Sequence, residues 1–298
     1  MKLLRFLALL FAFTGSALAI TDSKADAQKA EEAREEKILS ELKFQSGNIS
    51  ILEGRAELKL GDQFEYLDAA DTRKLIVDYF HNPPDAGTHT GTIVPKGWGR
   101  KLFAGSWVAV LDWREDGYVK DADYDSLDFN KKLNELKEAS HEDSDERVRQ
   151  GYSKMILTGW AQPPHYDKAT HKLYWAKSFD DGEPPEQLNY DIRVLGRAGV
   201  LEVSIVSTMP RLAQIQTQAP SILGAIEFTP NNRYSDYKAG DKVAAYGIGG
   251  LIGIGVLAKV GAFKGLWLLL LKGGKLVWIG IVAIGSWIAR LFGRRKQA

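Results

Sequence analysis

The chain has 298 residues, of which 45% are hydrophobic and 26% charged, a composition typical of a folded protein. It contains no cysteine, which excludes disulfide bonds, thiolate zinc sites, iron–sulfur clusters and a cysteine nucleophile. The net charge of +1 conceals a segregation, because residues 20–242 contain all 38 acidic residues but only 29 of the 39 basic ones. That stretch lacks the basic surface that nucleic-acid binding requires, so we predict no nucleic-acid partner.

The first 19 residues have the pattern of a secretory signal peptide. Lys2 and Arg5 form a positive start, residues 6–14 are apolar, and Ala17 and Ala19 are the small residues that signal peptidase accepts. We therefore expect cleavage after Ala19 and a mature chain that begins outside the cytoplasm. The alternative is an uncleaved N-terminal anchor.

Residues 20–46 predict a charged helical lead-in, because residues 22–44 are rich in Ala, Glu and Lys and contain no Gly or Pro. The apolar period then changes to two, which predicts two or three strands between residues 47 and 67. A short helix is expected over residues 69–80, stopped by Pro83 and Pro84.

The next elements follow from the same rules. They are a strand over residues 107–113, a charged helix over residues 124–150 with Asp125 or Ser126 as its N-cap, and a core-facing helix over residues 210–226. Two hairpins are predicted, one from strands 155–161 and 171–179 and one from strands 188–195 and 200–208. The first hairpin is expected to turn at residues 163–167, because prolines cannot donate ladder hydrogen bonds.

Strands in hairpins with few interspersed helices predict an α+β domain, built on a mostly antiparallel sheet with packed helices. We expect one extracytoplasmic domain over residues 47–230, followed by a juxtamembrane linker over residues 231–242.

Residues 243–292 predict a membrane anchor, with apolar segments over about 243–263 and 276–292 and a basic tail over 293–298. We favour a hairpin of two short transmembrane helices. The alternative is one crossing, with the other segment lying in the interface as an amphipathic helix. Glycines spaced by four in the first segment fit close helix contacts, so the anchor is a candidate for binding itself or another membrane protein.

Two clusters of polar residues could carry chemistry. Residues 121–128 resemble a calcium loop, but Ser126 and Lys132 occupy the positions where an EF-hand needs Gly and Glu. His165, Asp167 and His171 could hold a metal, yet their spacing matches no standard ligand pattern. We therefore predict a structural turn with no metal ligand, no cofactor and no catalytic residue. The aromatic residues clustered between 160 and 175 fit a sheet core, or alternatively a face that binds a glycan or peptide.

The order of several segments resembles a prokaryotic family of membrane-anchored proteins known only as domain of unknown function 2167. The resemblance runs over roughly residues 47–261 and rests on these stretches: 82–84, 91–95, 116–121, 159–167, 171–176, 188–193, 195–197, 232–236 and 243–247. It implies a bacterial envelope protein with a C-terminal anchor, and it supplies no activity from which a catalytic residue could be transferred.

These observations favour a binding or scaffolding module on the outer face of the bacterial inner membrane, with its main domain in the periplasm. The alternative is a carboxylate-dependent hydrolase or carbohydrate-active enzyme that acts on an envelope substrate, because paired Asp and Glu residues leave no sequence signature. Two carboxylates about 5–10 Å apart in an aromatic cleft would favour the enzyme.

Overall fold

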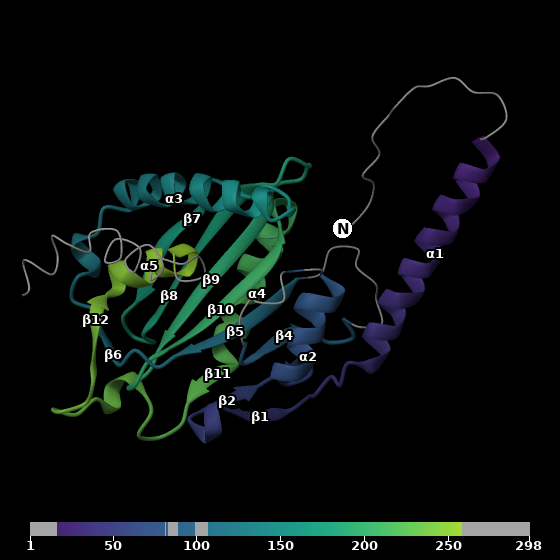
Figure 1. Ribbon diagram of the computed structural model, residues 1–298. Coiled ribbons are helices and arrows are strands. Elements are labelled where there is room, and N and C mark those ends of the chain that lie inside the picture. Colours follow the sequence, from purple (N-terminus) through teal and green to yellow (C-terminus); the bar gives the residue numbers. More distant parts are fainter. Residues whose placement is uncertain (1–16, 81, 83–88, 99–106, 258–298) are drawn as a thin grey trace, which may run out of the picture. The chain divides into compact units, whose positions relative to one another are not determined.

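The computed structural model describes residues 17–80, 82, 89–98 and 107–257 (Figure 1). The chain divides into two compact units, Met1–Ile252 and Gly253–Ala298. Most of the predicted signal peptide, the second apolar segment and the basic tail lie outside the described residues.

A seven-stranded sheet, here called the main sheet, forms the centre of the first unit. Its neighbouring strands are all antiparallel, in the order β3-β4-β5-β10-β9-β8-β7. The strands are β3 (Phe64–Asp68), β4 (Gly91–Pro95), β5 (Val108–Arg114), β7 (Ile156–Asp167), β8 (Lys172–Asp180), β9 (Gln187–Leu195) and β10 (Val200–Thr208). The predicted hairpin over residues 188–208 is confirmed, because β9 and β10 pair directly through the turn at Gly196–Gly199.

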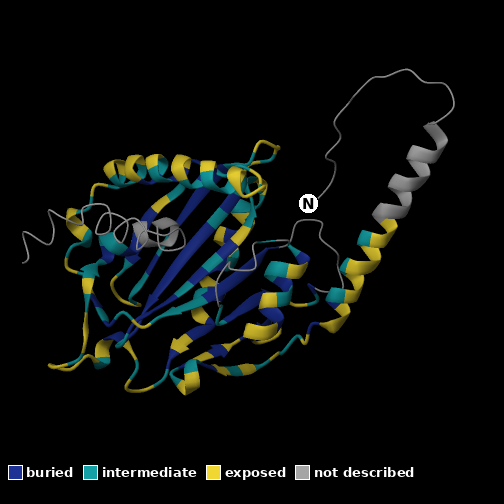
Figure 2. Ribbon diagram, viewed as in Figure 1, coloured by how far each residue is buried: buried dark blue, intermediate teal, exposed yellow. Residues whose placement is uncertain are grey.

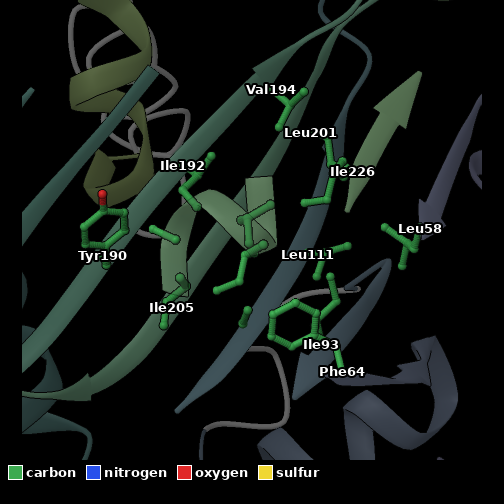
Figure 3. Packing of buried hydrophobic residues seen from close by; sticks show 14 of the residues in the cluster. Leu58, Phe64, Ile93, Leu111, Tyr190, Ile192, Val194, Leu201, Ile205 and Ile226 are labelled. Carbon is green, nitrogen blue, oxygen red and sulfur yellow. The ribbon is translucent and has the colours of Figure 1, made fainter. Parts of the chain in front are cut away.

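One face of the main sheet carries the larger hydrophobic core (Figures 2 and 3). Alternate residues of each strand contribute to it, as shown by Leu201, Val203 and Ile205 of β10, which are all fully buried. Helix α4 (Leu212–Gly224) adds Ile215 and Ile222, and the helix follows a 3-10 turn, η4 (Met209–Arg211). A small antiparallel sheet also contributes, in the order β1-β2-β11, from β1 (Asn48–Ile51), β2 (Ala56–Lys59) and β11 (Ile226–Phe228), with the short turn η1 (Leu52–Gly54) between its first two strands.

A second core joins the N-terminal helices to the opposite face of β3 to β5. Helix α1 (Ala17–Glu41), helix α2 (Ala69–Arg73) and the π-helical turn η2 (Lys74–Tyr79) supply or adjoin it, and Leu39, Leu75 and Val94 lie at its centre. The predicted helix over residues 22–44 is therefore docked at its C-terminal end, where Arg34 also donates to the carbonyl of Asp78 at 2.7 Å.

Helix α3 (Phe129–Arg149) packs along the edge strand β7. Its N-cap is Asp128, whose side chain accepts from the backbone N–H groups of Asn130 and Lys131 at 3.0 Å. The prediction that Asp125 or Ser126 caps this helix is wrong, because those residues form a separate 3-10 turn, η3 (Tyr124–Ser126), before the helix begins.

Strand β7 passes through Pro163 and Pro164 instead of turning there, so the predicted turn at residues 163–167 is wrong. The prolines lie where the β7–β8 register shifts between Gln162 and His165, and β7 has a strand neighbour on only one side. An edge strand tolerates proline at a bulge because no ladder hydrogen bond is then lost. The turn comes later, where Asp167 accepts from the N–H of Ala169 at 2.8 Å, which is the side-chain capping that the sequence predicts for this aspartate.

The remaining elements are β6 (Tyr118–Lys120), the turn η5 (Tyr234–Asp236), β12 (Val243–Gly247) and α5 (Ile248–Leu257). Strand β12 pairs in parallel with β6, so the first five residues of the predicted first membrane segment are strand and the helix begins at Ile248. The α+β fold with a mostly antiparallel sheet is confirmed. Within the described residues, no helix has the length and apolar character needed to span a bilayer.

Candidate functional site

Charged side chains form a continuous chain across the face of the main sheet opposite the larger core. Lys177 Nζ lies 3.0 Å from Asp191, Arg193 lies 3.5 Å from Asp191, and Arg193 Nε lies 3.4 Å from Glu202. Arg114 lies 3.6 Å from Glu202 and 2.6 Å from Asp116. We call these six residues the ion-pair chain: Lys177, Asp191, Arg193, Glu202, Arg114 and Asp116. Cations and anions alternate along it, so the chain is formally neutral.

The register of the sheet explains why these residues meet. Arg193 of β9 is paired with Glu202 of β10, and Asp191 with Ser204, so their side chains point to the same face. Ser204 donates to Asp191 at 3.0 Å. The guanidinium of Arg193 also lies over the ring of Trp175, 4.9 Å from its centre, which places an aromatic face beneath the central cation.

The centre of the ion-pair chain is buried. The side chains of Lys177, Asp191 and Arg193 are exposed by only 5%, 4% and 2%. Burial opposes ionisation of Asp191, but the positive charges of Lys177 and Arg193 outweigh it and hold its pKa below the usual range. Each charge is therefore stable only while its partners are in place.

Electrostatic attraction dominates over directional bonding in the middle of the chain. Within the described residues, Asp191 Oδ2, Arg193 Nε and Glu202 Oε1 are buried and have ion-pair partners but no hydrogen bond of good geometry. Such an arrangement depends on the exact number of charges more than on the position of any single atom.

The outer end of the ion-pair chain reaches the C-terminal part of the domain. Tyr246 of β12 donates a hydrogen bond to Asp116, and Arg114 lies over its ring, 5.7 Å from the centre. Burial opposes ionisation of both Arg114 and Asp116. Their mutual attraction and the contact with Tyr246 outweigh it, which raises the pKa of Arg114 and lowers the pKa of Asp116. Burial and Asp116 raise the pKa of Tyr246, so its hydroxyl keeps its proton and donates it.

Residues 231–252, which we call the C-terminal junction, are attached to the domain at several points. Asp123 accepts from the N–H groups of Ile248 and Gly249 at 2.9 and 3.0 Å, and so caps the start of α5. Arg197 donates two hydrogen bonds of 2.7 Å to Asp241. The predicted linker over residues 231–242 is thus ordered on the domain surface.

Two glycines permit the close approach of this junction. Gly117 has a φ of +106°, and a Cβ there would lie 2.7 Å from the carbonyl oxygen of Lys242, which accepts from Tyr118 N–H. A Cβ at Gly247 would lie 2.5 Å from Asp123 Oδ1. Side chains at either position would separate the junction from the residues that hold it.

A group of aromatic rings packs between the C-terminal junction and the domain. Tyr118 stacks on Tyr234 and Tyr237, with ring centres 4.4 and 4.2 Å apart, and His171 lies 4.3 Å from Tyr234. Tyr166 donates to Asp121 at 2.8 Å and lies 3.1 Å from His171 Nδ1. Burial, reinforced by the hydrogen bond to Asp121, raises the pKa of Tyr166.

The four aspartates of the calcium-loop-like segment, residues 121–128, make separate contacts and do not converge on one site. Asp121 binds Tyr166, Asp123 caps α5, Asp125 pairs with Lys168 at 2.7 Å, and Asp128 caps α3. No group of three His, Cys, Asp or Glu side chains suited to a metal occurs among the described residues. The absence of metal ligands at His165 and His171 stays a prediction.

The remaining candidates also lie apart. His165 packs on Tyr174 and is exposed, His89 lies 2.8 Å from Asp112, His141 is exposed on α3, and His81 falls outside the described residues. In the aromatic cluster, Trp175 is fully buried on the face of the ion-pair chain, whereas Trp160 is only partly buried and donates to the carbonyl of Phe129 at 3.1 Å.

Two cavities open on the described surface. One, of about 240 Å³, lies between β7 to β9 and α4 and is lined by uncharged side chains, including Tyr174 and Gln216. The other, of about 310 Å³, adjoins the C-terminal junction and contains Glu115 and Asp241, the latter already held by Arg197.

Sequence reasoning missed the ion-pair chain. Asp191, Arg193 and Glu202 alternate with apolar residues, which is the pattern of a strand with one face in water. One available signal is on β8, where Trp175 and Lys177 share a face, because tryptophan is highly buried on average and so indicates that this face is covered.

Comparison with known proteins gives one strong match. The family model described as "Protein of unknown function (DUF2167)" matches residues 43–285. No curated protein matches the chain. Among solved structures, the solution structure of cyanobacterial PsbP (CyanoP) from Synechocystis sp. PCC 6803 matches with a TM-score of 0.34 and 6% identity, covering 61% of this chain and 91% of that one.

Proposed function

The chain belongs to the DUF2167 family of proteins of unknown function, and from that membership we propose that it is a binding or scaffolding module of the bacterial envelope. In this proposal the signal peptide directs export, the C-terminal apolar segments anchor the chain in the inner membrane, and the α+β domain stands in the periplasm. The partners are the lipid bilayer and another membrane protein or a second copy of the chain.

The observation that carries the proposal is the C-terminal junction. Residues 231–252 are fixed to the domain by Asp123, Asp241 and the Tyr246–Asp116 contact, and the apolar sequence continues directly after them. A chain that enters a bilayer soon after such a junction holds its domain close to the membrane surface, without the slack of a flexible linker. That restriction suits a module that must present one surface to a membrane partner.

The segregation of charge supports the same orientation. The region between residues 20 and 242 holds all 38 acidic residues and 29 of the 39 basic ones. Three of the remaining lysines, Lys264, Lys272 and Lys275, lie between the two apolar segments, on the side that the positive-inside tendency favours as cytoplasmic. We keep the hairpin of two short helices as the form of the anchor, built from the apolar segments over about 243–263 and 276–292, the first of which becomes helical only after β12. Its first helix starts no earlier than Ile248, since β12 occupies the five residues before it.

We favour binding over carboxylate-dependent hydrolysis because several carboxylates are already buried or paired with cations. Asp191 and Glu202 are nearly buried between cations, and Asp241 is held by Arg197. The aromatic cavity has no carboxylate among its lining residues. A glycoside hydrolase needs two carboxyl groups that face the substrate from opposite sides of the scissile bond.

The topology is tested by alkaline phosphatase fusions in a bacterial host. We expect a mature N-terminus at Ile20 and an active fusion at Asn231. The hairpin requires an inactive fusion at Lys264 and an active one after Ala298. An inactive fusion at Asn231 together with an uncleaved N-terminus would overturn the envelope assignment. An active fusion at Lys264 together with an inactive fusion after Ala298 would show that only the second segment crosses the membrane, and would rule out the hairpin.

The scaffolding role is tested by quantitative co-purification after crosslinking in intact cells. The matched control is the same chain with Gly247→Leu, which would push the junction away from Asp123 at a position outside the main sheet. We expect a stoichiometric partner or dimer that is lost in the control. A clean monomer in both samples would refute scaffolding.

A further inference from the structure

The uncharged cavity between the main sheet and α4 has features of a ligand site. Its volume of about 240 Å³ is below the roughly 300–1,000 Å³ of sites that enclose drug-sized ligands, so it fits a single ring and not a larger molecule. The lining residues come from four elements far apart in sequence, namely β7, β8, β9 and α4. Figure 3 shows Tyr190 at the edge of the core on this side of the sheet.

Two tyrosine rings form one wall. Tyr174 and Tyr190 are nearly parallel, with an interplanar angle of 11° and ring centres 6.4 Å apart. Tyr190 is 2% exposed and therefore fixed, whereas Tyr174 is partly exposed. The electron-rich faces of such rings attract C–H groups that carry a partial positive charge, as the axial C–H groups of a pyranose do.

Two amides provide directional hydrogen bonds beside these rings. Gln216 donates to Gln162 at 2.7 Å, and both amides line the cavity beside Tyr190. The contact uses only one N–H of Gln216, so a second amide N–H and the amide oxygen remain for a ligand hydroxyl or acetamido group.

Helix α4 is irregular at the same place. Pro220 lies inside the helix and has no N–H, so the carbonyl of Gln216 lacks its usual helical donor four residues later. Both Gln216 and Pro220 line the cavity. A proline in a helix interior is costly, and here it leaves one backbone carbonyl without its helical donor beside an amide and two aromatic rings.

The chemistry of the lining excludes a charged ligand group as the main anchor, because no lining side chain carries a charge. Aromatic faces beside several amide and carbonyl groups fit a molecule with one apolar face and many hydroxyl groups.

We propose that this cavity binds one pyranose unit of an uncharged glycan, a hexose or an N-acetylhexosamine. The ring stacks on Tyr174, and its hydroxyl or acetamido groups bond to Gln216 and to the carbonyl freed by Pro220. This inference deepens the proposed function by giving the binding module a ligand class, and it rests on that function for where the glycan would be met.

The test uses the full chain in lipid nanodiscs prepared with a detergent that contains no sugar. Cellotetraose and tetra-N-acetylchitotetraose are the probes, measured by saturation-transfer NMR and titration calorimetry. Tetra-alanine with an acetylated N-terminus and an amidated C-terminus is the uncharged peptide comparison. We expect binding of at least one glycan and none of the peptide. Binding of the peptide alone, or of neither class, overturns the proposal.

Three variants separate a binding role from a structural one. Gln216→Ala removes an exposed side chain and is expected to weaken binding about three- to tenfold, the effect of one hydrogen bond, with an unchanged melting temperature. Pro220→Ala restores the helical donor and is expected to weaken binding by a similar factor while raising the melting temperature. Ser221→Ala, on the same helix but outside the cavity lining, is the control and should bind as the native chain does.

The glycan site is refuted if neither Gln216→Ala nor Pro220→Ala lowers the affinity for the glycan, or if the affinity falls only in a variant whose melting temperature also falls. The alkaline phosphatase fusions test the envelope assignment independently of glycan binding. Failure of glycan binding with active periplasmic fusions overturns this inference alone, and binding with inactive fusions overturns the envelope assignment alone.

Discussion

Replacing Asp191 by Asn tests whether the ion-pair chain depends on its count of charges. The amide keeps the size of the carboxylate but leaves Lys177, which is 5% exposed, 3.0 Å from a neutral group. Breaking a buried ion pair in this way costs about 3–5 kcal/mol, a large part of the roughly 5–15 kcal/mol that stabilises a typical domain. We expect a loss of this size in urea unfolding of the full chain, followed by tryptophan fluorescence.

The matched control is Asp125→Asn, which breaks an ion pair of similar length on the surface. Asp125 lies 2.7 Å from Lys168, but the two side chains are 72% and 60% exposed. Water screens that pair, so we expect no measurable change. The double variant Lys177→Met with Asp191→Leu removes one charge of each sign and should recover most of the stability lost in Asp191→Asn. Equal losses for Asp191→Asn and Asp125→Asn, or a double variant less stable than Asp191→Asn, would refute the reasoning.

Further expectations concern the C-terminal junction and the aromatic residues. Asp123→Ala should cost about 0.5–2 kcal/mol as the loss of a helix cap, and hydrogen exchange should become faster at the start of α5 but not in the main sheet. The hydrogen bonds from Arg197 lower the pKa of Asp241 to about 2. The stabilisation is therefore complete above the unfolded pKa of about 3.9 and disappears as the pH falls toward 2, which exchange measured between pH 5 and 2 would reveal as loss of protection around residue 241. Trp175→Ala should cost about 3–5 kcal/mol, and Trp160→Ala clearly less, because the second ring is only partly buried. Thermal unfolding that ranks the two tryptophans in the opposite order would contradict this.

Period-two patterns predicted most of the sheet correctly. The alternation in residues 188–208 placed both strands of the β9–β10 hairpin, because one face of each strand is continuously apolar and the turn between them is bounded by glycines. The strand order could not be predicted, since β5 and β10 pair although more than 80 residues separate them. Pairing over such a separation is decided by the packing of complete strands, which no local pattern records.

Errors arose where a local rule was overridden by neighbouring structure. The rule that proline ends a strand fails at Pro163 and Pro164, because an edge position and a register shift accommodate them. The apolar pattern from Val243 onward predicts one helix, yet the backbone of Lys242 and Val243 pairs with Tyr118 before the helix begins. In both places the deciding partner lies far away in the sequence.

The ion-pair chain also explains why the register of the main sheet is unique. Sliding β9 by one residue against its neighbours would carry Asp191 and Arg193 into the apolar core on the opposite face and bring Ile192 among the charges. An unpaired buried charge is far more costly than an imperfect apolar contact, so the alternating charges discriminate strongly against such slips. The same chain ends at Asp116 and Tyr246, next to the residues that begin α5. The correct register of the sheet and the attachment of the C-terminal junction are therefore parts of one electrostatic arrangement, and a change that unbalances the centre of the sheet should also weaken the junction.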